Sequence, residues 1–358
     1  MEMVLKSLRE NIKNNKYQAI MLTGLENPTA AKNLTYVTGY TGSYGVAIVT
    51  ETKQFFLTDF RYRDQVKTEC ADFTFVEVEG SLVSAIEKVL NDNEITVLGF
   101  DKKMRYQEYE MYQKLEVELV PLDNTIENLR LTKLPFEIDR LQKACEITDQ
   151  ALEYTLSLEL VGMKERDVEV ILKSKMLELG AENTWDRFIV ASGERGAMPH
   201  GSASDKVIQN NELVTFDIGC SYKGYTSDLT RTVAFGNPDP KLIEIYNIVY
   251  EAQVKAVKAA KAGMTGKELD SICRDHITEK GYGEYFKHGT GHGVGLDVHE
   301  GPRVSQANPE PLNVGTCITV EPGIYISGLG GVRIEDDLIL TEDGAIILNK
   351  FPKELIRL

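Results

Sequence analysis

Cysteine is scarce in this sequence and is not arranged for metal binding or cross-linking. The 358 residues contain five cysteines that lie far apart, and no Cys-x-x-Cys pair occurs. This spacing argues against a disulfide framework and against a thiolate zinc site. We therefore expect reduced thiols and a cytoplasmic protein. The cysteines are Cys70, Cys145, Cys220, Cys273 and Cys317.

Long apolar runs and excess positive charge are also missing. No run approaches the roughly 20 apolar residues that a bilayer-spanning helix requires. Residues 1–15 alternate charged and apolar side chains and lack the apolar core of a signal peptide. Lys plus Arg number 40 and Asp plus Glu number 55, a formal net charge of −15. This charge disfavours nucleic-acid backbones and anionic membranes as partners.

Short apolar runs alternate with helical patterns in the first part of the chain. This alternation predicts an α/β domain over residues 1–125. A helical pattern at Leu82–Leu90 separates two of the runs. The expected strands are Ala19–Thr23, Tyr44–Val49, Phe55–Thr58, Phe73–Val78 and Thr96–Phe100.

A domain boundary is indicated at Leu131–Pro135, because proline disfavours helix in the residue before it. We place a linker at 126–136 and a second domain at 137–358. In this second domain, a pair of helices followed by strands occurs twice, with starts about 102 residues apart, which predicts a pseudo-symmetric α/β core. The helices are expected at about 137–160, 165–179, 239–261 and 266–280.

Two aspartates are expected on one face of a hairpin. Leu213–Cys220 and Tyr225–Val233 are the strands, and Tyr222–Gly224 supplies the turn. Strand alternation then points Asp217 and Asp228 to the same side, directly opposite each other. Like charges so placed destabilise a buried sheet unless one is neutralised or a cation lies between them.

The same construction recurs in the second half of this domain. Cys317–Glu321 and Gly331–Asp336 flank a glycine-containing turn at Ser327–Gly330. The pairing places Glu321 opposite Glu335. Two acid pairs at matching places in two half-repeats favour a functional site over two solvated surface pairs.

Four of the five histidines stand in segments rich in glycine or proline, which allow close backbone approach and expose the ring. The fifth, His276, falls in an expected helix and is assigned a structural role. The four are His200, His288, His292 and His299.

Four carboxylates and one imidazole carry a formal charge of −4, which two divalent cations would balance. Oxygen-rich ligation without thiolate favours Mn²⁺, Co²⁺, Fe²⁺ or Mg²⁺ over a structural Zn²⁺. Two such ions about 3.5–4 Å apart acidify a shared water and bind both oxygens of a tetrahedral intermediate. The residues alone therefore indicate a hydrolase with a dinuclear, carboxylate-bridged metal centre.

These residues resemble the pita-bread metallopeptidases, which include methionine aminopeptidase, aminopeptidase P and prolidase. The resemblance implies that Asp217 binds one metal and that His292 and Glu321 bind the second. Asp228 and Glu335 would bridge the two. It implies two divalent ions, with Mn²⁺ expected and Co²⁺, Fe²⁺ or Zn²⁺ as alternatives. The matching runs are DIGCSYKGYTSDLTRT, HGTGHGVGLDVHEGPR, TVEPGIYI and GGVRIEDD.

The resemblance also implies roles around the metals. Glu321 would act as general base towards a bridging water, so that the resulting hydroxide attacks the peptide carbonyl. Arg333 is expected among the substrate-binding groups, where it could also orient its neighbours. Three outer histidines would hold the substrate carbonyl and the intermediate: His200, His288 and His299.

The N-terminal part narrows the resemblance to Xaa-Pro aminopeptidases and prolidases. Tyr36–Gly45, Leu57–Gln65 and the run NLRLTKLPFEIDRLQKACEITDQAL look like these enzymes, so the resemblance covers nearly the whole chain. It implies a creatinase-like N-terminal domain, a homodimer and small proline-containing peptides as substrates. An Xaa-Pro bond has no N–H, and attack by a metal-held hydroxide does not require one.

Two substrate classes and one non-enzymatic reading remain open at this point. A prolidase takes Xaa-Pro dipeptides, and Arg303 would bind the proline carboxylate through its guanidinium fork. An aminopeptidase P takes longer chains, and the TGYTGSYG and TDFRY segments lean towards it. The alternative from another class is a non-catalytic pita-bread module that binds peptides or proteins. Such modules generally lose metal ligands, and all five are present here.

Overall fold

The computed structural model describes residues 2–358, with the backbone alone for residues 28–30. Contacts between residues divide the chain into two compact units, Met1–Arg130 and Leu131–Leu358. Helix α6 (Thr125–Arg130) ends the first unit, and helix α7 (Pro135–Leu156) opens the second. Pro135 occupies the first turn of α7, where its missing N–H is no loss because those amides have no partner within the helix.

The first unit is built on a six-stranded sheet in the order β4-β3-β2-β1-β5-β6. Strands β1, β2 and β3 pair antiparallel, and the outer pairings are parallel. All five expected strands are present, with ends shifted by up to two residues. β6 was not predicted, because it is short and ends in a proline. The strands are β1 (Ala19–Thr23), β2 (Val46–Thr50), β3 (Gln54–Thr58), β4 (Thr74–Glu77), β5 (Val97–Phe100) and β6 (Glu118–Pro121).

Five more helices complete this unit. The helix expected at Leu82–Leu90 is present as α4 and begins at Ser81, whose side chain accepts a hydrogen bond from the backbone N–H of Ser84. The helices are α1 (Glu2–Lys13), α2 (Pro28–Thr38), α3 (Arg63–Glu69), α4 (Leu82–Asp92) and α5 (Tyr106–Tyr112). The predicted α/β character of this part of the chain is confirmed.

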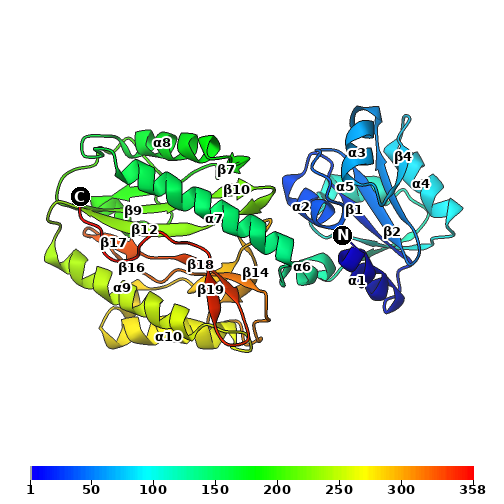
Figure 1. Cartoon of the computed structure of the whole chain (residues 1–358). Coiled ribbons are helices and arrows are strands. Elements are labelled where there is room, and N and C mark those ends of the chain that lie inside the picture. The colour runs from blue at the N-terminus through cyan, green and yellow to red at the C-terminus, as the bar shows by residue number, and fades with distance from the viewer. Residues whose placement is uncertain (1) are drawn as a thin grey trace. The chain divides into compact units, whose positions relative to one another are not determined.

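The second unit repeats a pair of helices followed by strands, as the sequence predicts. Figure 1 shows α7 and α8 along one side of the strands of this unit, and α9 and α10 along the other. The remaining helices are α8 (Glu165–Glu178), α9 (Pro240–Ala259) and α10 (Gly266–Glu279). The first-half strands are β7 (Asn183–Thr184), β8 (Ile189–Ser192), β9 (Glu212–Ile218), β10 (Cys220–Tyr222), β11 (Tyr225–Thr226) and β12 (Leu229–Phe235).

The second-half strands form a five-stranded sheet in the order β14-β13-β15-β18-β19 and a separate two-stranded pair, β16-β17. They are β13 (Gly291–Gly293), β14 (Glu300–Val304), β15 (Cys317–Val320), β16 (Gly323–Ile326), β17 (Gly330–Arg333), β18 (Asp336–Leu340) and β19 (Ala345–Ile347).

Each half of this unit has its own hydrophobic core between its helices and one face of its strands. In the first half, Leu152 and Leu172 pack with Phe216 of β9, and in the second, Ile245 and Leu269 pack with strand residues. The core takes one face of each strand because strand side chains alternate. The opposite faces carry polar groups that point away from the helices.

Local sequence accounts for the helix ends in this unit. Asp239 caps α9 by accepting a hydrogen bond from Lys241 N, with Pro240 in the first turn. Thr265 and Glu268 form a reciprocal capping box at the start of α10. These signals fixed the helix starts that the sequence predicts at about 239 and 266.

The structure bears on three expectations from the sequence, which concern the cysteines, membrane-spanning helices and His276. All five cysteines are buried free thiols. Across residues 2–358, we find no helix with the length and apolar character needed to cross a bilayer. His276 is buried within α10, and its Nδ1 lies 2.8 Å from Lys255 Nζ, which agrees with a structural role.

Strand β13 requires glycine at Gly293, because another backbone lies against it. A Cβ atom there would stand 1.9 Å from the carbonyl oxygen of Gly301. We expect Gly293→Ala to lower the free energy of unfolding by about 3 kcal/mol, since the strands would have to separate. Chemical denaturation measures this. Gly344→Ala is the control, because nothing lies within 4 Å of its Cβ position. Equal stability of both variants would contradict the close approach.

Candidate active site

A cavity of about 1260 Å³ opens between the strands of the second unit. Its wall also includes Trp185, Arg187, Lys287 and Tyr325, none of which the sequence singled out. Every residue predicted for the site lines this cavity, namely His200, Asp217, Asp228, His288, His292, His299, Arg303, Glu321, Arg333 and Glu335. The structure therefore gathers residues spread over more than 130 positions of sequence into one place.

The first hairpin has a different register from the one expected. Asp217 pairs with Thr230, not with Asp228, so the prediction of directly opposed aspartates was wrong by two residues. The cause is a two-residue turn at Lys223 and Gly224, whose φ angles of 48° and 82° are both positive. A shift of two residues preserves the face to which side chains point. Asp217 and Asp228 therefore still face the same side.

The second hairpin has the expected register but is divided between two sheets. Val320 pairs with Asp336 on one side of the break, and Gly323 pairs with Arg333 on the other. Glu321 and Glu335 lie at the break itself, opposite each other. Pro322 follows Glu321 and cannot donate to a strand ladder, which explains why β15 ends there.

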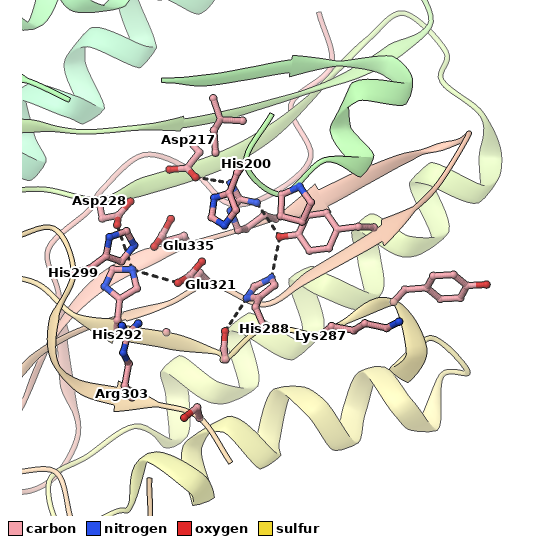
Figure 2. Close-up of a pocket in the computed structure, with 18 of the residues that line it drawn as sticks. His200, Asp217, Asp228, Lys287, His288, His292, His299, Arg303, Glu321 and Glu335 are labelled. Carbon is pink, nitrogen blue, oxygen red and sulfur yellow. Dashed lines mark hydrogen bonds and ion pairs between the residues drawn. The ribbon is translucent and has the colours of Figure 1, made fainter. Parts of the chain in front are cut away.

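The two hairpins meet through Thr230 and Glu335. The Glu335 N–H donates to Thr230 O at 3.1 Å, and Thr230 Oγ1 donates to Glu335 Oε2 at 2.6 Å. The acidic pair of each half thus faces that of the other. His292 on β13 completes the group: its Nε2 lies 3.6 Å from Asp228 Oδ2 and 3.4 Å from Glu321 Oε1 (Figure 2).

Electrostatics in this group is unfavourable without a cation. Burial, followed by the charge of neighbouring carboxylates, raises the pKa of Asp228 and Glu335 well above their usual range. Burial raises the pKa of Glu321 to about 8. The buried atoms Asp217 Oδ1, Asp228 Oδ1 and Glu335 Oε1 have no hydrogen-bond partner among residues 2–358. Unpartnered buried oxygens on mutually repelling carboxylates are what a bound cation would satisfy.

His292 is in the form that binds metals. Burial lowers its pKa to about 3, so the imidazole is neutral. Nδ1 lies 3.0 Å from Gly293 O, and a carbonyl can only accept, which assigns the proton to Nδ1 and leaves the Nε2 lone pair facing the carboxylates. Ligand atoms of Asp228, His292 and Glu335 lie within 4.8 Å of one another. The residues present fit a divalent-cation site.

A chain of hydrogen bonds borders this group on one side. His288 Nε2 lies 3.0 Å from the hydroxyl of Tyr325, and Arg333 Nη1 donates to the same hydroxyl at 2.8 Å. Arg333 Nη2 donates to Asp217 Oδ2 at 2.5 Å. The guanidinium is 4% exposed, so it holds Asp217 in place. Strand alternation could have identified Tyr325, because pairing of Gly323 with Arg333 puts Tyr325 on the same face.

The other predicted residues stand further out on the cavity wall. His200, His299 and Arg303 are exposed. The His299 ring centroid lies 4.2 Å from that of His292, and burial together with the charge of Arg303 lowers the pKa of His299. Arg303 makes no ion pair with any other of the described residues 2–358, so its guanidinium is available to a ligand.

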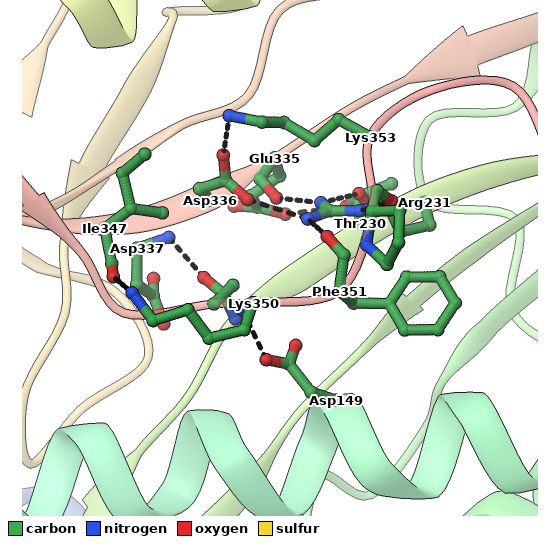
Figure 3. A network of polar contacts seen from close by, with 12 residues as sticks. Asp149, Thr230, Arg231, Glu335, Asp336, Asp337, Ile347, Lys350, Phe351 and Lys353 are labelled. Carbon is green, nitrogen blue, oxygen red and sulfur yellow. Dashed lines mark hydrogen bonds and ion pairs between the residues drawn. The ribbon is translucent and has the colours of Figure 1, made fainter.

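A second polar network lies behind the acidic group and holds its backbone (Figure 3). Arg231 Nη1 donates to Glu335 O at 2.5 Å, and Arg231 Nη2 donates to Asp336 Oδ1 at 2.8 Å. Asp337 Oδ2 accepts from Asp228 N at 2.8 Å. Because main-chain positions of Asp228 and Glu335 are fixed in this way, their carboxylates are held close together despite repulsion.

Comparison with known proteins agrees with this geometry. The model of metallopeptidase family M24 matches residues 139–342, and that of the creatinase/prolidase N-terminal domain matches residues 5–132. The uncharacterized peptidase YqhT of Bacillus subtilis is 46% identical over 331 residues, which cover 92% of this chain and 94% of that protein. The Xaa-Pro dipeptidase of Pyrococcus horikoshii is 40% identical over 356 residues, 98% of each chain.

Solved structures give the same result. A Xaa-Pro dipeptidase from Bacillus anthracis has a TM-score of 0.96 at 42% identity and covers 100% of this chain and 99% of that one. An X-Pro aminopeptidase from Thermotoga maritima has a TM-score of 0.92 at 37% identity, covering 98% and 100%. The backbone is therefore shared by dipeptidases and aminopeptidases. With this fold, this acidic site and both family matches, the chain belongs to metallopeptidase family M24 and is a metallopeptidase of the prolidase type.

Proposed function

We propose that this protein hydrolyses Xaa-Pro dipeptides with two divalent metal ions. The observation that carries the proposal is the convergence of four carboxylates and one neutral imidazole in a buried group with unpartnered oxygens. Asp217 would bind one ion, and His292 and Glu321 would bind the other. Asp228 and Glu335 would bridge both.

The donor set guides the choice of metal. Four carboxylates and an imidazole without thiolate suit Mn²⁺, with Co²⁺, Fe²⁺ or Zn²⁺ as alternatives. When bound, the two ions would supply a nucleophilic hydroxide near neutral pH and polarise the substrate carbonyl. Free buried thiols agree with a reducing compartment, so we retain a cytoplasmic location as a proposal. A homodimer stays a prediction from resemblance.

The protein's own groups divide the remaining work. Glu321 would take a proton from the attacking water, because a 3.5 Å contact with Thr319 Oγ1 is the one hydrogen bond its carboxylate makes among residues 2–358. Of the outer histidines, His200 and His299 would donate hydrogen bonds to the substrate carbonyl and to the intermediate. In His288, Nδ1 lies 2.8 Å from Gly289 O and holds the proton, so Nε2 accepts from the Tyr325 hydroxyl, and His288 would act through Tyr325. Arg333 would keep Asp217 oriented, a role that its hydrogen bond to Asp217 Oδ2 supports.

Arg303 supports dipeptides as the substrate class. Its guanidinium lines the cavity, lies close enough to lower the pKa of His299, and has no ion-pair partner among residues 2–358. An Xaa-Pro dipeptide substrate carries a free proline carboxylate, which an arginine binds through two parallel hydrogen bonds. Aminopeptidase activity on longer chains is the second candidate, favoured by the similarity to the Thermotoga maritima structure.

Removal of a proposed bridging ligand tests the metal centre. We expect Asp228→Asn and Glu335→Gln to lose stoichiometric Mn²⁺ and to lower kcat/KM at least about 1000-fold. Metal analysis and initial rates on an Xaa-Pro dipeptide measure both effects. The metal-free variants should melt at or above the temperature of the metal-free wild type, because each substitution removes a group that repels its neighbours when ionised. Full activity in either variant would refute the assignment, and a wild type without metal would favour the non-catalytic module.

The substrate class is tested by substitution of Arg303. We expect Arg303→Ala to raise KM for an Xaa-Pro dipeptide about 10- to 100-fold, the loss expected for a charged bidentate contact. KM for the matching Xaa-Pro-Yaa peptide should change little. Arg187→Ala is the control, because Arg187 is exposed on the same wall. A wild-type preference for the longer peptide, with no effect of Arg303→Ala, would support an aminopeptidase.

The raised carboxyl pKa values predict how pH changes the stability of the metal-free protein. Burial raises the pKa of Glu321 and of Asp337 to about 8. The folded chain therefore holds protons that the unfolded chain has released, and stability falls as pH rises from about 6.5 to about 8.5. Bound Mn²⁺ keeps its ligands ionised, so the metal-induced rise in melting temperature should grow over this interval.

Thermal melting at three pH values, with and without Mn²⁺, measures this dependence. The histidines with lowered pKa values are neutral in the folded state, but in the unfolded state they keep some charge up to about pH 7.5 and oppose the decline there. Above about pH 7.5 they do not contribute, so the decline is measured most directly between about pH 7.5 and 8.5. Glu321→Gln should show a shallower decline in metal-free buffer. A metal-free melting temperature that stays constant or rises over the interval would contradict the analysis.

A further inference from the structure

Glu165 is a buried carboxylate that the proposed chemistry does not use. It is the first residue of α8 and is fully buried. Five donors reach it, all from residues 192–204. Oε1 accepts from Ser192 N and Ser192 Oγ, both at 2.8 Å. Oε2 accepts from Arg195 Nε at 2.9 Å, Ser204 N at 3.1 Å and Ser204 Oγ at 2.6 Å.

These donors belong to one loop: Ser192 lies at its start, Arg195 three residues later and Ser204 at its end. The loop leaves β8 at Ser192 and returns at Ser204, and it carries His200 in between. Arg195 also donates through Nη2 to Ser202 O at 2.6 Å, which ties the outgoing part to the returning part. The Glu165 carboxylate thus joins both ends of the loop, which Ala203 N also closes by donating to Phe188 O at 3.0 Å. The outer part of the loop presents His200 to the cavity that Asp217 also lines (Figure 2).

We propose that Glu165 is the positioning residue for His200. A buried carboxylate is stable only when its oxygens are hydrogen-bonded, and here the closed loop supplies every donor. A long loop without such a tie samples many conformations. The closed form fixes where His200 stands relative to the metal-binding residues. This inference rests on the proposed function, because the role of His200 is part of that proposal.

Glutamine cannot replace Glu165, although it has the same shape. Both carboxylate oxygens accept from a main-chain N–H, that of Ser192 on one side and that of Ser204 on the other. An amide has one oxygen, so its NH₂ would face a fixed N–H whichever way the group is turned. The serine hydroxyls can rotate, but these two amides cannot. Glu165→Gln should therefore release one end of the loop.

Glu169 provides a matched control on the same helix. It also accepts a hydrogen bond from a main-chain N–H, that of Phe188 at 2.9 Å, and it pairs with Lys173 at 2.9 Å. Neither contact is made to a residue of the loop 192–204, because Phe188 lies just before β8. Glu169→Gln removes the same charge and the same kind of bond without touching the His200 loop.

The test is a double-mutant cycle in the Mn²⁺-loaded enzyme. We expect Glu165→Gln to lower kcat about tenfold, the scale of a small displacement of a catalytic group. Mn²⁺ stoichiometry and affinity should stay as in the wild type. In a His200→Ala background, Glu165→Gln should lower kcat less than about twofold further, because coupled residues are not additive. Glu169→Gln should change kcat less than twofold in both backgrounds.

Hydrogen exchange gives a readout that does not depend on activity. Glu165→Gln should speed exchange in residues 193–203 selectively, and Glu169→Gln should not. If the wild type fails to hydrolyse Xaa-Pro peptides, the proposed function fails. Hydrogen exchange would still test whether Glu165 holds the loop 192–204. If Glu165→Gln does not fold, Arg195→Met takes its place in the cycle, because Arg195 is partly exposed and supplies two of the loop contacts.

Three results would overturn the inference. If Glu165→Gln lowers kcat tenfold in the His200→Ala background as well, Glu165 acts through another group. Loss of Mn²⁺ from Glu165→Gln would show an effect on the metal centre. Unchanged exchange in residues 193–203 would show that the carboxylate does not hold the loop.

Discussion

Repulsion among four carboxylates, two of them buried and two partly exposed, is the constraint on which the second unit depends. Asp217, Asp228, Glu321 and Glu335 line one cavity, and burial raises the pKa of three of them. Like charges in a low-dielectric site cost several kcal/mol unless they are neutralised. A metal-free fold tolerates them by holding protons, whereas divalent cations bound there would turn the same repulsion into attraction. Metal binding at this group would therefore be linked to folding.

The architecture holds these acids together from behind. Each half of the pseudo-repeat supplies one acidic hairpin on its own hydrophobic core, so neither pair can retreat without exposing apolar surface. Arg231 and Asp337 fix the main chain of Glu335 and Asp228 from the side away from the cavity. The neutral His292 fits between the acids because its Nδ1–H is used by a carbonyl. Preorganisation of this kind keeps ligands ready for the metal.

The outer wall is organised differently from the acidic group. His200, His299 and Arg303 are exposed there, and we propose that their polar groups meet the substrate. Their positions depend on ties such as that between Glu165 and the loop 192–204. The site thus has two parts: the acidic group with His292, which would bind metal, and the outer residues His200, His299 and Arg303, which would recognise a peptide. We expect substitutions of the outer residues to change substrate preference without changing metal binding.

The sequence by itself determined most of the elements, the repeat and ten of the residues that line the site, because alternation and helix caps act over a few residues. It also determined that the Glu321 and Glu335 strands pair in the expected register. Only the tertiary structure decided that Asp217 pairs with Thr230, since two positive φ angles shortened the turn. Contacts such as that of Tyr325 with Arg333, or of Glu165 with its loop, join residues far apart in sequence, and no local pattern specifies them.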